Sequence, residues 1–282
     1  MDEPLVSIVM SVHNAEHTLE EAILSLAQQS YRNWELIVCD DASTDGSLAL
    51  LERLVAKLEN GATILSNDQN MMLAYSLNRC LAVASGQLIA RMDADDYSEP
   101  NRLSEQVAFL LSNPDLDLVC TAMRRFSALG LGDIVQPAAL APDRTTLGRT
   151  SRVPFCHATI VARREVFTRL GGYTVSWRTQ RGQDLDLWYR FFESGMTGRN
   201  LPAALYRVRE DEAAIRRRTP RARLGAFVTR IRGNWALRLG FRAYVVAASD
   251  LAKIVVPYFV IDRFRAGGRC NSSPAIEKVQ GS

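Results

Sequence analysis

The sequence predicts an α/β fold, built on a doubly wound, mostly parallel, Rossmann-like sheet and followed by a basic helical tail. Short apolar, β-branched runs alternate in the N-terminal part with longer segments whose apolar residues recur at helical spacing. Strand–helix units in series are joined by right-handed crossovers in a parallel sheet. With 282 residues and 47% hydrophobic content, the chain can form one large domain with an appendage.

Each element follows from its own pattern. Buried strands are predicted at 5–12, 34–39 and 62–65, and a fourth strand begins at Leu88 and ends at the aspartates of LIARMDADD. Amphipathic helices are predicted at 16–29, 47–58, 71–84 and 102–111. Farther along, the pattern predicts strands at 116–123 and 157–162 and helices at 163–170 and 185–194.

Polar side chains cluster where the first four strands end: His13 and Asn14, Asp40 and Asp41, Asn67 and Asp68, Asp93 and Asp95. Open α/β sheets bind their ligands at this edge. The carboxylates of Asp93, Asp95 and Asp96 repel one another and need a cation or strong hydrogen-bond donors if they are buried. A D-x-D at a strand end suits Mg²⁺ or Mn²⁺ bound together with a diphosphate, although an isolated D-x-D also fits a solvated turn.

Composition excludes several classes of protein. The five cysteines are scattered without C-x-x-C spacing, which indicates thiols in a reducing compartment and no zinc site. The acidic start, MDEPLVSIVMSV, lacks the basic flank of a signal peptide, so we expect a cytoplasmic protein. No G-x-G-x-x-G follows the first strand, which argues against dinucleotide binding. We expect no nucleic-acid partner.

Ordered motifs over about residues 4–210 resemble glycosyltransferase family 2. They are SIVMSVHNAEHTLEEAILSLAQQSYRNWELIVCDDASTDGS, NDQNMMLAYSLNRCLAVASGQLIARMDADD, FCHATIVARREVF, GGY and QDLDLWYRFF. The resemblance implies a GT-A fold and an inverting, metal-dependent transfer of a sugar from a nucleotide-diphosphate donor to an acceptor hydroxyl. A UDP-sugar is the expected donor, and the expected acceptor is a surface polysaccharide or a lipid-linked glycan. The unassigned segment 128–154 is expected at the edge of the sheet or near the acceptor pocket.

The resemblance assigns roles residue by residue. Asp40 matches the aspartate that binds the nucleobase, and Val12, His13 and Asn14 line the same pocket. Asp93 matches the first aspartate of the D-x-D, near the ribose and the metal, and Asp95 matches the second, which ligates Mn²⁺ or Mg²⁺. Asp184 matches the base that deprotonates the acceptor. His157, Asp186 and Arg209 are candidates for contacts to the acceptor or the phosphates.

Simpler alternatives stay open for several of these residues. Asp40 could cap the turn into the second helix, and Asp184 could be the N-cap of the helix that follows it. His157 could be a packed core histidine. The chain also departs from the family pattern, with Gln183 in place of a glutamate, Met71 in place of a glycine and Arg209 in place of a histidine. Gln183 is the reason to keep an alternative function, a GT-A domain that binds nucleotide or glycan without turnover.

The tail is rich in arginine from Arg207 to Arg242, and its apolar residues Leu224, Val228, Ile231, Trp235 and Leu239 fall on one helical stripe. A basic helix with aromatic residues on its apolar side suits an anionic membrane surface. The alternative is a helix that packs on the catalytic domain and exposes a basic face. Asp250 and Lys253 argue against a membrane span at 243–261. We therefore expect a catalytic domain at 1–212, a helical extension at 213–265 and a disordered end at 266–282.

Overall fold

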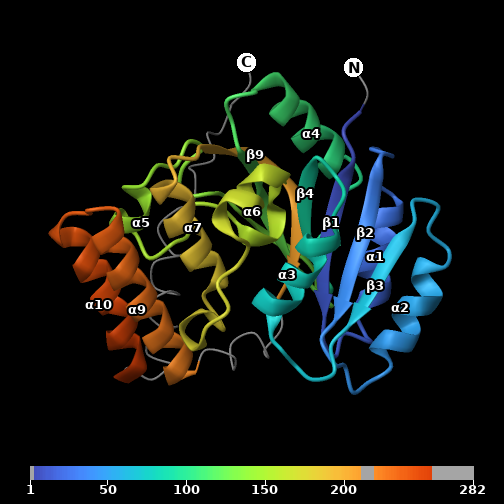
Figure 1. Cartoon of the computed structure of the whole chain (residues 1–282), viewed down its shortest axis with the longest axis horizontal. Helices are drawn as coiled ribbons and strands as arrows, with labels where there is room; N and C mark the ends of the chain where they lie inside the picture. Colours follow the sequence, from blue (N-terminus) through green and yellow to red (C-terminus); the bar gives the residue numbers. More distant parts are fainter. Residues whose placement is uncertain (1–2, 211–218, 256–282) are drawn as a thin grey trace, which may run out of the picture.

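A computed structural model describes residues 3–210 and 219–255 of the chain (Figure 1). Within these ranges the strands form one sheet in the order β3-β2-β1-β4-β8-β6-β9-β5, with β7 paired to β6. Their bounds are β1 Val6–Val12, β2 Trp34–Asp40, β3 Ala62–Ser66, β4 Leu88–Asp93, β5 Tyr97–Ser98, β6 Leu118–Ser127, β7 Gly130–Val135, β8 Val161–Arg163 and β9 Gly198–Arg209.

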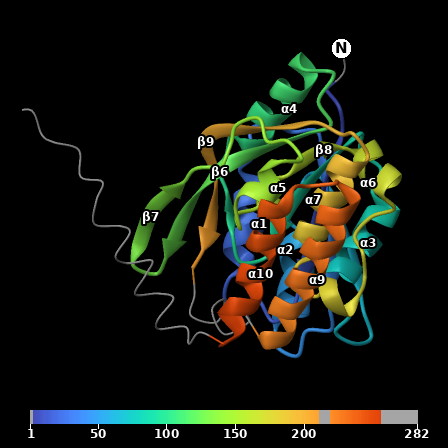
Figure 2. The ribbon, with the colours of Figure 1, turned by 90° about the vertical axis from the view of Figure 1, so that its left-hand side faces the viewer.

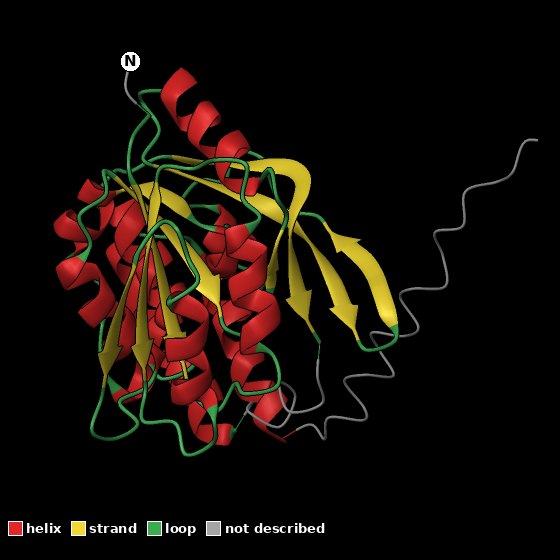
Figure 3. Cartoon of the chain, turned by 90° about the vertical axis from the view of Figure 1, so that its right-hand side faces the viewer, coloured by secondary structure: helices red, strands yellow, loops and turns green. Residues whose placement is uncertain are grey.

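Strands β1 to β4 pair in parallel, as predicted. Helices lie on both faces of the sheet (Figure 3). Their bounds are α1 Leu19–Ala27, α2 Ser47–Val55, α3 Leu73–Val83, α4 Arg102–Ser112, α5 Thr146–Arg149, α6 Arg164–Leu170, α7 Gln183–Glu193, α9 Pro220–Ala236 and α10 Phe241–Val255, with 3₁₀ turns η1 His157–Thr159 and η2 Trp177–Thr179. The predicted α/β, doubly wound architecture is therefore confirmed.

Alternation along the central strands divides the core into two clusters. In β1, Ile8 and Met10 point into the cluster under α1, α2 and α4, while Val9 points into the cluster under α3, α6 and α7. Both faces of the strand are buried, which explains why its sequence is largely apolar. The site can therefore form only at the strand ends, where polar residues begin.

The second half of the sheet differs from the prediction. The strand expected at 157–162 is wrong in its first half, because residues 157–159 form the turn η1, in which the Thr159 hydroxyl donates to the Cys156 carbonyl. The short strand β8 follows and runs antiparallel to β4 and β6. The unassigned segment 128–154 contains β7 and α5. Figures 2 and 3 show β6, β7 and β9 extending to one side of the molecule.

The C-terminal helices α9 and α10 lie side by side against α7, η2 and α5 (Figures 1 and 2). None of the helices among the described residues is long and apolar enough to cross a membrane. The arginines at 216–218 and the end predicted to be disordered at 266–282 lie outside the described residues. The domain limits stay a prediction.

Candidate active site

Two cavities meet at the carboxyl ends of β1 and β4. The strand-end cavity, of about 590 Å³, is lined by His13, Asn14 and Asp41 on one side and by Gln180 and Arg181 on the other. The loop-side cavity, of about 580 Å³, is lined by residues of segments 135–138 and 152–158, so part of the unassigned segment 128–154 borders a cavity. That this cavity receives the acceptor stays a prediction. The two cavities share these lining residues: Leu73, Asp93, Asp95, Gln183 and Asp184. A ligand in either cavity therefore reaches the same carboxylates.

Three carboxylates converge at the end of β4. Oxygen atoms of Asp93, Asp95 and Asp96 lie within 4.8 Å of one another. Burial, and then the charges of Asp93 and Asp95, raise the pKa of Asp96 well above its usual range. The Arg209 backbone N–H donates to Asp96 Oδ1 at 2.8 Å and fixes this carboxyl group. A divalent cation would relieve the repulsion, and carboxylate oxygens are the ligands that Mn²⁺ and Mg²⁺ prefer, so the cluster fits such an ion.

The Arg91 side chain is buried beside this cluster. Its guanidinium forms an ion pair with Asp93 through Nη1 and Nη2, and Nη1 lies 2.8 Å from Oδ2. Burial lowers the pKa of Arg91, but the charge of Asp93, the hydroxyls of Tyr206 and Tyr173 and the hydrogen bond to Asp93 together outweigh that effect and leave the pKa above its ordinary value. Sequence reasoning missed Arg91, although a charged residue inside the apolar run LIARM was a signal that this strand carries a buried ion pair.

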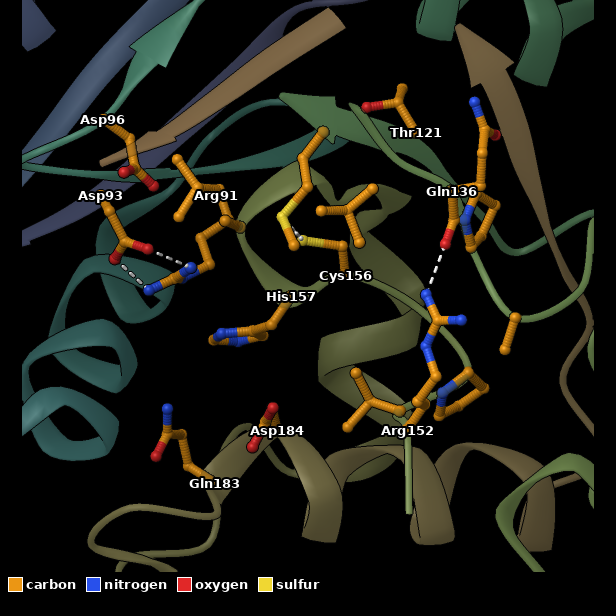
Figure 4. Close-up of a pocket in the computed structure, with 18 of the residues that line it drawn as sticks. Arg91, Asp93, Asp96, Thr121, Gln136, Arg152, Cys156, His157, Gln183 and Asp184 are labelled. Carbon is orange, nitrogen blue, oxygen red and sulfur yellow. Dashed lines mark hydrogen bonds and ion pairs between the residues drawn. The ribbon is translucent and has the colours of Figure 1, made fainter. Parts of the chain in front are cut away.

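Asp184 stands on the wall that the cavities share. It is the second residue of α7, whose N-cap is Gly182 without any side-chain cap, so the alternative of an N-cap aspartate is wrong. Asp184 Oδ1 accepts only from the adjacent Leu185 N–H among the hydrogen bonds described, at 2.8 Å. Figure 4 shows Asp184 on α7 facing the space that Arg91 and Asp93 also face. Its carboxylate is placed to act on a ligand.

Burial raises the pKa of Asp184, and the Leu185 N–H and the charge of Arg91 lower it in part. The neighbouring Gln183 lines the same wall and adds no negative charge. The pKa of Asp184 is thus elevated by burial, even though the family's neighbouring glutamate is missing. A carboxylate with a raised pKa is a stronger base once it is ionised.

His157 lies on the floor of the loop-side cavity but is buried and already bonded. Its Nε2 is 2.8 Å from the hydroxyl oxygen of Tyr173, and its ring packs edge-on against Trp188. Burial, and then Arg91, lower the pKa of His157 well below its usual value. A neutral imidazole held in this way positions Tyr173 and the cavity floor, which agrees with the alternative of a packed histidine.

At the end of β2, the structure distinguishes Asp40 from Asp41. Asp40 ends β2 and is buried, with Oδ2 accepting from the Ser43 N–H at 3.1 Å, and it does not line the strand-end cavity. Alternation along β2 turns Asp40 to the face of Leu36 and Val38. Asp41 lines the cavity instead. Of these two buried carboxylates, Asp41 is the one that lines the strand-end cavity, and the contact of Asp40 to the nucleobase stays a prediction.

Asp41 also holds the turn that leads into α3. Its Oδ1 accepts from the Met71 N–H and its Oδ2 from the Met72 N–H, both at 2.8 Å. Met72, not Met71, has a positive φ of 71°, so the glycine that the family carries at position 71 is not needed for this turn. His13 and Asn14 line the cavity as expected, whereas Val12 is buried beneath it.

Asp186 and Arg209 do not line either cavity. Asp186 is buried and accepts from the Arg178 and Arg190 side chains, which makes it part of the support for α7. The Arg209 Nε donates to the Asp95 carbonyl at 2.9 Å, and its guanidinium also forms an ion pair with Glu21. Arg209 thus fixes the turn that carries the D-x-D, and the contacts predicted for Asp186 and Arg209 stay predictions.

Solved structures share this fold. A structure of TarS from S. aureus in complex with UDP has a TM-score of 0.63 at 17% identity, covering 95% of this chain and 75% of that one. The mannosyltransferase PcManGT from Pyrobaculum calidifontis, in complex with GDP-Man and Mn²⁺, has a TM-score of 0.64 at 19% identity, covering 95% and 81%. The fold is that of a GT-A glycosyltransferase.

Sequence comparison gives the family. The model described as Glycosyl transferase family 2 matches residues 7–171. The "Putative glycosyltransferase EpsE" of Bacillus subtilis is 40% identical over 98% of this chain and 98% of its own length. The Escherichia coli UDP-Glc:alpha-D-GlcNAc-diphosphoundecaprenol beta-1,3-glucosyltransferase WfgD is 40% identical over 40% of this chain and 44% of its own length. The chain belongs to glycosyltransferase family 2 and is a glycosyltransferase.

Proposed function

We propose that this glycosyltransferase moves a sugar with inversion from a UDP-sugar to an acceptor hydroxyl, in the synthesis of a surface polysaccharide or a lipid-linked glycan. One observation carries the proposal: Asp184 lies on the wall between two cavities of similar size and faces both. In this proposal the nucleotide occupies the strand-end cavity, with Asp41, His13 and Asn14 around it. The acceptor occupies the loop-side cavity.

The reaction is a single displacement. Asp184 accepts the proton of the acceptor hydroxyl as its oxygen bonds to the anomeric carbon, and the bond from that carbon to the diphosphate breaks. The electron pair of the broken bond leaves with the nucleoside diphosphate. Arg91 favours the ionised form of Asp184 and holds Asp93 in place. A Mn²⁺ or Mg²⁺ ion held by Asp95 and Asp93 would supply positive charge to the departing diphosphate.

The relatives favour the donor and the acceptor class. WfgD is named for a UDP-Glc donor and a diphosphoundecaprenol acceptor. A structure of TarS was solved with UDP-GlcNAc. PcManGT is a counterexample with GDP-Man, which is why GDP-sugars belong in any test. With an acceptor of this kind, we propose that the enzyme works as a peripheral protein at the cytoplasmic face of the inner membrane.

A panel of nucleotide sugars tests the proposal by thermal shift, with Mn²⁺ or with EDTA. A donor present at 100 times its Kd adds about 2.7 kcal/mol to the free energy of unfolding. UDP-sugars should raise the Tm in Mn²⁺ and should lose this effect in EDTA. Transfer to a lipid-linked acceptor is then followed by mass spectrometry. Donor binding without any transfer would favour the non-enzymatic binding module, and a Tm that no nucleotide sugar raises would overturn the proposal.

A further inference from the structure

Helix α9 packs on the catalytic domain with its small and polar side. The buried residues on this side include Gly225, Thr229, Gly233 and Asn234. A Cβ atom at Gly233 would overlap the ring of Tyr189 on α7, so α9 and α7 are in close contact there. Tyr189 also donates its hydroxyl to Asn234 Oδ1 at 2.7 Å. The helix is therefore fixed to the domain without using its large apolar residues.

Four large apolar residues of α9 and α10 are exposed to solvent. Leu224 and Trp235 of α9 have 43% and 79% of their surface exposed. Phe241 and Val245 of α10 have 82% and 54% exposed. On α9, Leu224 and Trp235 fall on the side of the helix opposite to Thr229 and Gly233, at 100° per residue. A stable fold rarely leaves this much aromatic surface together in water without a partner.

The same surface is uniformly basic. Between positions 219 and 249 the sequence has six arginines and no aspartate or glutamate. Arg221, Arg232 and Arg242 of the same two helices are exposed as well. We call these three arginines, with Leu224, Trp235, Phe241 and Val245, the hairpin surface. Figure 2 shows α9 and α10 next to each other on the side that faces the viewer.

Charge decides which partner fits. A second copy of the chain would oppose arginine to arginine across the contact, which costs energy when charges are desolvated. An anionic bilayer offers negative phosphates to the arginines and an interface in which Trp and Phe rings are stable. Arginine stems can cover apolar surface while their heads reach the phosphates.

The hairpin is also connected to the wall of the loop-side cavity. Arg230 of α9 donates from Nη2 to the Ser151 carbonyl at 2.9 Å, directly before the residues 152–154 that line this cavity. A Cβ atom at Gly148 would touch Ala243 of α10. A membrane bound at the hairpin surface would therefore have a fixed position relative to the cavity proposed for the acceptor.

We infer that the hairpin surface docks the enzyme on an anionic phospholipid membrane, with Trp235 and Phe241 inserted at the level of the headgroups. The inference rests on the proposed function only for its biological setting, because membrane binding is measured without donor or acceptor. It adds to the proposed peripheral location the residues that make the contact and the orientation they impose.

Sedimentation of the full chain with vesicles of phosphatidylglycerol and phosphatidylcholine, or of phosphatidylcholine alone, tests the inference. The protein should bind the anionic vesicles and be released by high salt. The double variant Trp235→Ala/Phe241→Ala should lose about tenfold or more of the affinity. Replacing Arg221, Arg232 and Arg242 by Gln should weaken binding about fivefold for each arginine.

A matched control removes exposed apolar residues elsewhere. Leu24 on α1 and Leu111 on α4 are 49% and 55% exposed, and α1 lies on the far side of the molecule from α9 and α10 (Figure 1). Leu24→Ala/Leu111→Ala should bind the vesicles like the wild type. All variants should keep the wild-type circular dichroism and the wild-type response to nucleotide sugars. Equal vesicle binding by both double variants would overturn the inference, as would a dimer in light scattering that Trp235→Ala/Phe241→Ala abolishes.

Discussion

Replacing Asp186 by Asn tests the ion-pair network that supports the catalytic helix. The Asp186 carboxylate accepts from Thr174 Oγ1 at 2.6 Å, from Arg178 Nη1 at 2.6 Å and from Arg190 Nε at 2.8 Å. Asn keeps the size of the side chain but removes its negative charge, so Arg178 and Arg190 lose their ion-pair partner. We expect a loss of about 3 kcal/mol, the lower end of the range for a broken buried ion pair. The Tm should fall by about 6–9 °C in a chain of this size.

The destabilisation by Asp186→Asn should become smaller as the pH falls into the acid range. Burial raises the pKa of Asp186, but hydrogen bonds from Thr174, Arg178 and Arg190 outweigh it and leave the pKa below its usual value. A carboxyl whose pKa is lowered by folding stabilises the protein above its unfolded-state pKa, which is about 3.9, and loses this contribution as the pH falls further. The difference between wild type and Asp186→Asn should be constant from pH 7 to pH 5 and shrink below about pH 4.

Urea unfolding followed by circular dichroism measures the difference in the free energy of unfolding between the wild type and Asp186→Asn. Asp184→Asn is the matched control on the same helix. The buried Asp184 carboxylate has a raised pKa, so its ionised form costs stability at pH 7, and Asn removes that cost. Asp184→Asn should therefore unfold at the wild-type urea concentration or above it. If Asp186→Asn unfolds at the same midpoint as the wild type at pH 7, the network does not support α7 and the reasoning fails.

Three further predictions concern the metal, the helix contact and the base. Excess EDTA should abolish transfer, and Asp95→Asn should weaken the response to Mn²⁺; full activity in EDTA would exclude the proposed ion. Gly233→Ala should lower the free energy of unfolding by about 1–3 kcal/mol because its methyl group would overlap Tyr189, whereas Gly240→Ala, with nothing within 4 Å, should not. The acid limb of kcat/KM should lie above the usual carboxyl range, because burial raises the pKa of Asp184; a limb near pH 4 would contradict this.

The N-terminal half of the fold could be predicted from the sequence because its signals are local. Buried parallel strands and amphipathic helices have different periods, and the predicted starts of β1, β2 and β3 lie within one residue of those observed. The strand β9 was not predicted. Its segment contains Pro202 and several arginines, and it becomes a strand through pairing with β6 and β5, which are distant in sequence.

The sequence predicted which carboxylates belong to the site, but it did not predict the shape of the cavities. Asp93, Asp95 and Asp184, which are far apart in the chain, do line one wall. Two features depend on tertiary structure and could not be read from spacing. One is the direction of the side chains at the end of β2, which places Asp41, and not Asp40, on the wall of the strand-end cavity. The other is the loop-side cavity, because its walls come from segments without a regular period.

In the tail, the periodicity of apolar residues predicted a helix but not which of its sides is buried. The pattern identified the stripe that contains Leu224 and Trp235, but a stripe does not say whether it is buried or exposed. The structure gives the answer, because small residues such as Gly233 allow α9 to approach α7 closely and the opposite side carries the apolar residues. The helix packs on the catalytic domain, as one alternative had it, and it also exposes Leu224 and Trp235 of the stripe. Binding to a membrane surface stays a prediction.

The central claim is that Asp184 is the base at the junction of two substrate cavities, and Asp184→Asn tests it most directly. Asn has the same size and can still accept from the Leu185 N–H, so folding and donor binding should be unchanged. A positioned base contributes about 10²–10⁴-fold to the rate, so kcat for sugar transfer should fall by that factor. Transfer by Asp184→Asn at close to the wild-type rate, with wild-type donor affinity, would contradict the account.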